Sequence, residues 1–197
     1  MKKIITLIII FLIYTILIKT CPVITSWDES VIIYVQSLLK DLPLIIPLLP
    51  DCILYSIMIA VPIIASFGWS IYKKNIEPAL FMIVTPLFAY LCKFILKPLI
   101  HRPRPPMDLQ IAIHPHSFSY VSTHSLITFC IWGLVICFLH KYCRNKYLKI
   151  AGITFSALWI IFVGLSRVWL GVHFPTDVIG AYLLGFIFLT IYSKIRL

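Results

Sequence analysis

The segment from Ser166 to Asp177 carries an arginine, a histidine and an aspartate at a spacing suited to chemistry on a phosphate group. Pro175 is favoured in the first turn of a helix, so we expect a helix to begin at Phe174–Pro175. His173 then lies at the mouth of this helix, with Asp177 about one turn further on the same face. A carboxylate there can hold one imidazole nitrogen as a donor and leave the other free to attack phosphorus.

Arg167 lies in the same segment and offers a planar fork of donors that suits phosphate oxygens. A simpler interpretation is that Arg167 and Asp177 only pair with each other at the edge of a membrane. This segment alone does not favour either interpretation over the other.

A second polar stretch runs from Lys97 to His124 and is rich in proline, histidine and basic residues. Lys97 and Arg104 could surround a phosphate together with Arg167, and His124 could protonate a leaving oxygen. Ser122 stands where a helix N-cap would be, and the exposed N–H groups of a helix start favour an anion.

Each of these signals also has an ordinary explanation. Ser122 could be a simple helix cap, and a lone histidine such as His124 is more often structural. Arg102 and Lys93 could serve only to anchor lipid headgroups. Taken together, the clusters favour a functional site, because ionisable groups at membrane depth are costly and usually functional.

The composition places this chemistry in a membrane. Of the 197 residues 61% are hydrophobic, and the mean hydropathy is +1.01. A soluble domain of this size could not bury so much apolar surface, so we expect one integral membrane domain over residues 1–197. The net charge of +10 does not indicate a nucleic-acid partner, because no basic patch carries interleaved aromatic residues.

The hydropathy pattern predicts an all-α fold with six membrane spans. Several predicted spans are shorter than the roughly 20 residues needed to cross a bilayer, so flanking residues must complete them. The first could instead be a cleaved signal peptide, but no cleavage site of small residues follows it. The predicted spans are Ile4–Ile18, Cys52–Tyr72, Pro78–Leu96, Ser122–His140, Ile150–Leu165 and Val178–Tyr192.

A short interfacial helix is expected after the first span. The sequence Ser26–Glu29 matches a capping box that would start it. Apolar residues follow at helical spacing, among them Trp27, Tyr34 and Leu38. Packing of this stripe against the bundle explains the spacing equally well.

Lysine and arginine positions predict the orientation. With the N-terminus inside, ten of the seventeen basic residues fall on the cytoplasmic side, and five of the other seven belong to or border the two polar stretches. We therefore expect both termini in the cytoplasm and the two polar stretches on the outer side. The basic, isoleucine-rich composition favours a bacterial inner membrane.

The chain resembles the type 2 phosphatidic acid phosphatase superfamily, whose membrane members have six spans and three motifs. The third motif is Ser-Arg, five residues, His, three residues and Asp. It is matched throughout by Ser166, Arg167, His173 and Asp177. The resemblance is carried by a motif core over residues 97–177, and the layout of spans extends it to the whole chain.

The first motif, a lysine followed by six residues and Arg-Pro, is matched by Lys97, Arg104 and Pro105. The second motif departs from the family pattern Pro-Ser-Gly-His, because this chain has Val121-Ser-Thr-His124. Threonine lacks the backbone freedom of glycine but still offers an N–H to a phosphate oxygen. The departure is compatible with activity.

The resemblance implies a role for each matched residue. His173 would form a phosphohistidine, Asp177 would orient it, and His124 would act as the general acid. Cationic side chains would take the place of a metal, so no metal or other cofactor is expected. The phosphate would be held by Lys97, Arg104, Ser122, Thr123 and Arg167.

The expected function is hydrolysis of a lipid phosphate or diphosphate, with membrane lipids as the surroundings. A polyprenyl (di)phosphate or a phosphoglycerolipid is favoured as the substrate. A protein that binds or translocates lipid phosphates without chemistry is the alternative, but it would not need both histidines and the aspartate. A haloperoxidase-like enzyme is a third possibility, although those relatives are soluble.

Overall fold

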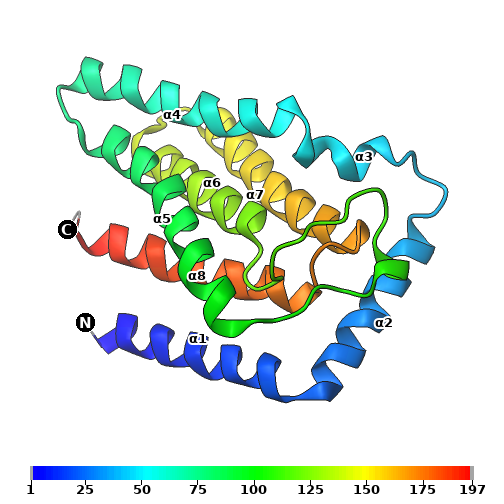
Figure 1. The fold of residues 1–197 in the computed structure, drawn as a ribbon. Coiled ribbons are helices and arrows are strands. Elements are labelled where there is room, and N and C mark those ends of the chain that lie inside the picture. The colour runs from blue at the N-terminus through cyan, green and yellow to red at the C-terminus, as the bar shows by residue number, and fades with distance from the viewer. Residues whose placement is uncertain (1, 196–197) are drawn as a thin grey trace.

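The computed structural model describes residues 2–195 as an assembly of helices, drawn in Figure 1. Six of the helices are long and apolar enough to cross a membrane, which confirms the predicted all-α fold with six spans. The six are α1 (Lys2–Thr20), α4 (Ile53–Lys73), α5 (Glu77–Ile100), α6 (Thr123–Tyr142), α7 (Lys146–Trp169) and α8 (Pro175–Ile195). Four of them extend beyond their predicted ranges at both ends, whereas α4 and α6 begin one residue later than predicted and extend only at the C-terminal end.

The shorter elements lie between these spans. After α1 come the helix α2 (Pro22–Leu38), the single turn α3 (Ile45–Leu48) and the 3-10 turn η1 (Leu49–Asp51). A second 3-10 turn, η2 (Met107–Leu109), interrupts the long loop between α5 and α6. Every regular element in the described part of the chain is therefore helical.

The helix α2 differs from the expectation at its start. It begins at Pro22, because proline is favoured in the first turn of a helix. The predicted capping box was wrong, since Ser26 lies inside the helix and its hydroxyl bonds the carbonyl of Pro22. One face of α2 exposes Trp27 and Tyr34, whereas Asp28 and Ile32 are fully buried against the bundle.

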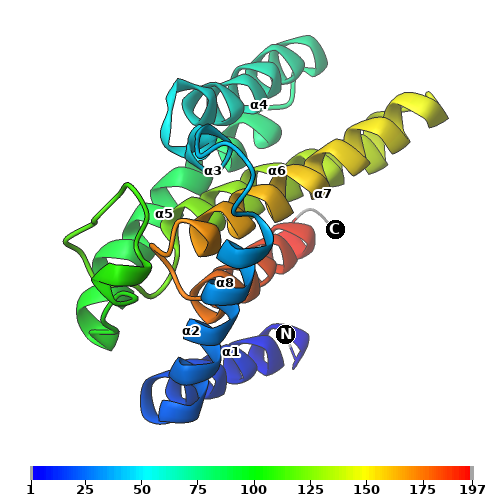
Figure 2. The same cartoon turned by 90° about the vertical axis from the view of Figure 1, so that its right-hand side faces the viewer.

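The helices α6 and α8 form the centre of the assembly and are the most buried of the spans. Helix α1 packs along α8, α2 crosses the ends of α7 and α8, and α4 packs on α5 (Figures 1 and 2). The core of α6 is made of Leu126, Cys130, Ile131 and Leu134, none of which is exposed.

An even number of spans places both termini at one end of the bundle. Figure 1 shows them there, with the loops before α6 and α8 at the opposite end beside α2 and α3. The two polar stretches of the sequence thus meet at the same end, as the span count requires. Which side of the membrane each end faces stays a prediction.

Candidate active site

The two polar loops and the helix ends around them enclose a cavity of about 250 Å³. Separate segments contribute to its wall: the end of α5, the loop after it, the start of α6, the end of α7 and the loop before α8. Six of the eight predicted site residues line the cavity. They are Lys97, Arg104, Thr123, His124, Arg167 and His173.

His173 is placed as a nucleophile would have to be. Its side chain is buried, and its Nε2 atom lies 3.5 Å from a terminal nitrogen of Arg104. Its Nδ1 atom lies 3.5 Å from Oδ2 of Asp177, which is longer than a good hydrogen bond. Asp177 therefore stands behind the ring, on the side away from the cavity.

Burial, together with the positive charge of Arg104, lowers the pKa of His173 to about 3. A lowered pKa means that the neutral ring dominates at every pH above that value. We expect ring signals of His173, assigned by their loss in His173→Gln, not to titrate between pH 5 and 8 in histidine-labelled protein. A titration midpoint near 6.5 would contradict this placement of the ring.

Asp177 is held by the start of α8 and by its neighbours. Its Oδ2 accepts the backbone N–H of Phe174 at 2.9 Å and the hydroxyl of Ser119. Its Oδ1 accepts a terminal nitrogen of Arg102 at 2.6 Å. With both oxygens bonded and the side chain fully buried, Asp177 is a fixed anchor behind His173.

Arg102 is not a lipid anchor, so that interpretation was wrong. Only 5% of the residue is exposed, and its guanidinium lies 4.4 Å from the ring of Phe174. Its second terminal nitrogen pairs with Asp28 of α2 at 2.6 Å. Asp28 also accepts the backbone N–H and the hydroxyl of Thr176. This carboxylate–arginine–carboxylate chain joins α2 to the first turn of α8.

Two cations of the cavity, Lys97 near the end of α5 and Arg104 in the loop after it, are oriented by carbonyl groups instead of carboxylates. Arg104 donates from Nε to the carbonyl of Ser117 at 2.7 Å and from a terminal nitrogen to the carbonyl of Val172. Lys97 donates to the carbonyl of Phe118 at 2.5 Å. Burial lowers the pKa of Arg104 to about 10, so it remains a cation at neutral pH. Neither cation is neutralised by a carboxylate within 4 Å among the described residues, which suits them to an anionic ligand.

Asp51, at the end of η1, is a site residue that the sequence did not reveal. Its carboxylate pairs with both terminal nitrogens of Arg167, with nitrogen–oxygen distances of 2.8 and 2.7 Å. It also lies 3.7 Å from Nε2 of His124. Arg167 is therefore already paired with an internal anion.

Two predicted phosphate-binding residues at the start of α6, Ser122 and Thr123, are placed differently with respect to the cavity. Ser122 is the N-cap residue, as expected, but its hydroxyl is buried against Ser125 at 2.9 Å and does not line the cavity. The neighbouring Thr123 does line the cavity, and its buried hydroxyl has no hydrogen-bond partner in the described part of the chain. A phosphate contact is thus more accessible to Thr123 than to Ser122.

The turn between α7 and His173 depends on Gly171. Its φ of +65° lies in the left-handed region, and an added Cβ would lie 1.9 Å from the carbonyl oxygen of Leu109. We expect Gly171→Ala to destabilise the protein by about 1–3 kcal/mol and to slow turnover. Thermal unfolding in detergent would measure the loss.

Gly68→Ala is the matched control for this substitution, because nothing lies within 4 Å of the added Cβ at Gly68 inside α4. It should leave the melting temperature unchanged or slightly higher. Equal melting temperatures for the two variants would show that the turn at Gly171 tolerates a side chain.

A second, larger cavity of about 500 Å³ adjoins the first. The two share Asp51, Tyr55, Tyr90, His124 and Ile127. Beyond the shared residues its wall is largely apolar and follows α4 towards the middle of the bundle, for example at Ile59 and Ile63. The polar cavity and the largely apolar cavity thus meet at His124.

No group of three or more histidine, cysteine, aspartate or glutamate side chains within residues 2–195 is arranged to hold a metal ion. The site is instead dominated by lysine and arginine.

The model of the PAP2 superfamily matches residues 78–197. Phosphatidylglycerophosphatase B of Bacillus subtilis (strain 168) is 35% identical over 132 residues, which cover 66% of this chain and 63% of that protein. The chain therefore spans slightly less than two thirds of this relative.

A solved structure is similar over the full length. It is described as the first transmembrane PAP2-type phosphatidylglycerolphosphate phosphatase from Bacillus subtilis, and it matches with a TM-score of 0.76 and 26% identity. The match covers 100% of this chain and 96% of that one. Since the family model, the fold and the residues around the cavity all agree, the chain belongs to the PAP2 superfamily.

Proposed function

We propose that this protein is a membrane phosphatase that hydrolyses a lipid phosphate through a phosphohistidine intermediate. The observation that carries the proposal is the union of two cavities. One gathers Lys97, Arg104, Arg167 and two histidines around a space large enough for a phosphate, and the other is a mostly apolar groove. An amphiphile with a phosphate head and a hydrocarbon tail fits such a pair.

The first chemical step is attack by Nε2 of His173 on phosphorus. A new P–N bond forms, the bond from phosphorus to the lipid oxygen breaks, and His124 gives its proton to that oxygen. Asp177 stabilises the positive charge on the phosphorylated ring. Lys97, Arg104 and Arg167 stabilise the charge on the phosphoryl oxygens, which is greatest in the transition state.

The second step is hydrolysis of the intermediate. His124, now neutral, takes a proton from a water molecule as the water attacks phosphorus. The P–N bond breaks, inorganic phosphate leaves, and His173 returns to its neutral form. Each histidine thus ends in the state in which it started, so the cycle needs no external reagent other than water.

The names of the similar protein and of the similar solved structure favour phosphatidylglycerol phosphate as the substrate. This lipid is a phosphoglycerolipid with a terminal phosphate monoester, one of the two classes expected from the sequence. A polyprenyl diphosphate remains the other class. The orientation with both termini in the cytoplasm of a bacterium, and the site at the outer face, belongs to the same proposal.

The experiment is phosphate release from a panel of lipids by the purified protein in detergent, with a chelator present. We expect hydrolysis of phosphatidylglycerol phosphate, at a rate that the chelator does not change. Loss of activity on chelation would contradict a metal-free mechanism. Absence of hydrolysis across the panel would favour a protein that only binds lipid phosphates.

Asp51 provides a sharper test of the phosphate site. Because its carboxylate pairs with Arg167 inside the cavity, it repels an incoming phosphate. We expect Asp51→Asn to bind inorganic phosphate about tenfold more tightly, measured as product inhibition. Asp41→Asn, an exposed change in the preceding turn, is the control and should have no effect. Weaker phosphate binding in Asp51→Asn would mean that the carboxylate mainly holds Arg167 in place.

A further inference from the structure

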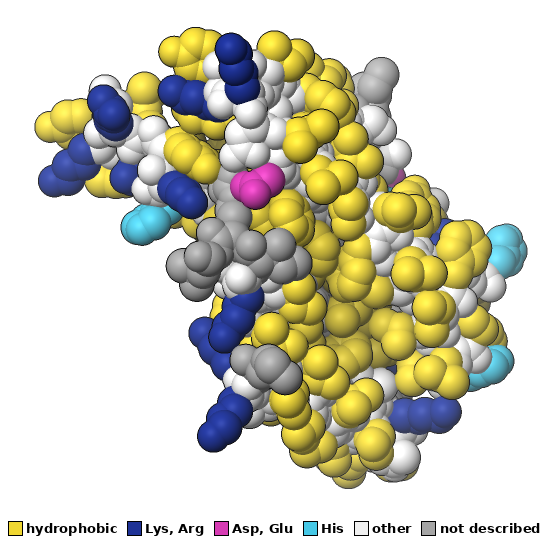
Figure 3. Space-filling model, turned by 90° about the vertical axis from the view of Figure 1, so that its left-hand side faces the viewer, with side chains coloured by type: hydrophobic (Ala, Val, Ile, Leu, Met, Phe, Trp, Pro, Cys, Tyr) yellow, Lys and Arg dark blue, Asp and Glu magenta, His cyan; other side chains and the backbone are white. Residues whose placement is uncertain are grey.

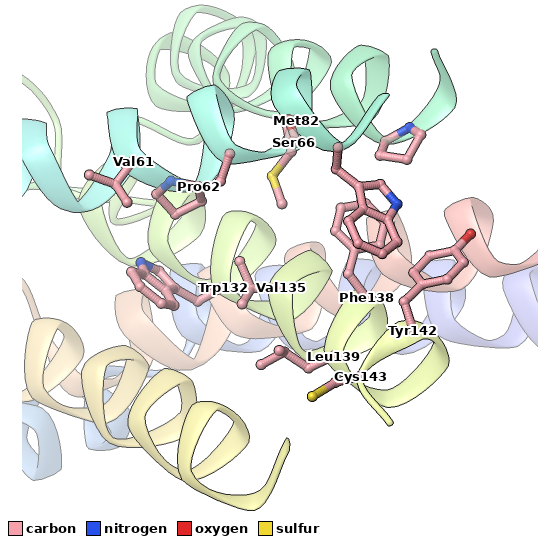
Figure 4. Close-up of a pocket in the computed structure, with 13 residues that line it drawn as sticks. Val61, Pro62, Ser66, Met82, Trp132, Val135, Phe138, Leu139, Tyr142 and Cys143 are labelled. Carbon is pink, nitrogen blue, oxygen red and sulfur yellow. The ribbon is translucent and has the colours of Figure 1, made fainter. Parts of the chain in front are cut away.

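A third cavity lies at the other end of the bundle and takes no part in the proposed chemistry. It has a volume of about 480 Å³ and is formed between α4, α5 and α6 (Figure 4). Its wall is hydrocarbon and aromatic, with residues such as Pro62, Met82, Trp132 and Phe138. The hydroxyl of Ser66 in this wall already donates to the carbonyl of Ile63 at 2.6 Å. Such a wall suits an apolar ligand better than water.

The dimensions of this cavity match one leaflet of a bilayer. Along α6 it extends from Trp132 to Cys143, which is roughly 16 Å at a rise of 1.5 Å per residue. The hydrocarbon core of a bilayer is about 30 Å thick, so the cavity spans about half of it. One acyl chain of a lipid in the leaflet on the side of the termini would fill this depth.

The end of the cavity that lies nearest to the chain termini carries a cluster of aromatic rings with two lysines. The rings of Trp69 on α4 and Tyr142 on α6 lie 5.4 Å apart and both line the cavity. The ammonium of Lys73 lies 5.4 Å from the ring of Trp69, and that of Lys141 lies 5.7 Å from the ring of Tyr142. Two cations from different helices are therefore held at one mouth, at the depth where tryptophan and tyrosine meet lipid headgroups.

These two lysines form no ion pair in the described part of the chain. Neither Lys73 nor Lys141 pairs with a carboxylate within 4 Å among residues 2–195, and their ammonium groups lie over aromatic rings. Figure 3 shows basic side chains around this end of the molecule, with an acidic side chain exposed among them. The mouth therefore offers positive charge to a ligand, and the interior offers hydrocarbon.

We propose that this cavity is a binding site for an anionic glycerophospholipid of the leaflet on the side of the termini. One acyl chain lies between α4 and α6, and the phosphate lies between Lys73 and Lys141. The site is separate from the catalytic cavity, which involves the opposite ends of the same helices, near Asp51 and His124. The lipid bound here is a structural ligand and not a substrate.

Native mass spectrometry of the detergent-purified protein can test the proposal. Phosphatidylserine and phosphatidylcholine with identical acyl chains are suitable probes, because neither is a substrate or product of the proposed reaction. We expect one molecule of phosphatidylserine to be retained in preference to phosphatidylcholine. The double variant Lys73→Ala/Lys141→Ala should lose about tenfold in affinity for phosphatidylserine, since each lysine near a headgroup contributes a modest attraction.

Two further variants separate the parts of the site. Ala65→Phe, at an exposed position in the cavity wall, should reduce retention of both lipids. Lys2→Ala/Lys3→Ala removes two exposed charges from the same end of the molecule but away from the cavity, and should change nothing. Lipid hydrolysis should stay close to the wild-type rate in all of them, so the result is independent of the proposed function.

Equal retention of the two lipids by the wild-type protein would overturn the proposal. So would undiminished binding of phosphatidylserine by Lys73→Ala/Lys141→Ala.

Discussion

Replacing His173 with alanine is expected to lower the rate of phosphate release by about 10⁴-fold or more. The loss is this large because removing a nucleophile abolishes the covalent route, leaving only the contribution of binding and electrostatics. His173 is the one histidine of the cavity that has its free nitrogen beside Arg104 and a carboxylate behind its ring. Initial rates in detergent micelles, with membrane extracts from the same expression host as blanks, would measure the effect.

His140→Ala is the matched control for this variant. His140 is exposed and lies near the end of α6 remote from the site, so its removal should leave the rate unchanged. A His173→Ala protein that is folded, as judged by its melting temperature, and still releases phosphate at the wild-type rate would contradict the proposed mechanism.

Replacing Arg102 with alanine is expected to cause the largest loss of stability. The substitution leaves the carboxylates of Asp28 and Asp177 buried without their shared cation. Breaking a buried ion pair from one side costs about 3–5 kcal/mol. Because Asp177 also loses an anchor, activity should fall together with the melting temperature measured in detergent.

Two comparisons make the Arg102 result interpretable. Arg102→Lys keeps a charge but cannot reach both carboxylates with a planar fork, so we expect an intermediate melting temperature. Arg144→Ala removes an exposed arginine between α6 and α7 and should have almost no effect. If Arg102→Ala were as stable as Arg144→Ala, the buried chain of charges would not hold α2 to α8.

Much of this arrangement could be predicted from the sequence, because its signals are local. Long apolar runs identify the spans, and Pro175 marks the start of α8 at the predicted place. The eight predicted site residues also line one cavity, apart from Ser122 and Asp177. Spacing along a helix and the count of spans are sufficient for these predictions.

The residues that were missed act through contacts distant in sequence. Asp28 and Asp51 lie before residue 78, where the match to the family model begins, yet each pairs with an arginine of the core. Nothing in the local pattern of α2 or η1 indicates these pairings. The sequence did hold one signal for them. Burying a carboxylate near a membrane is costly, so an acidic residue there is expected to have a basic partner.

The most direct test of the account is to trap the covalent intermediate. Protein incubated briefly with phosphatidylglycerol phosphate that carries ³²P in its terminal phosphate, then denatured in alkali, should retain label that acid removes. The label should be absent from His173→Ala and present in His140→Ala. A wild-type enzyme that hydrolyses the lipid without ever carrying label, or a His173→Ala protein that carries as much as the wild type, would contradict the central claim that His173 attacks phosphorus.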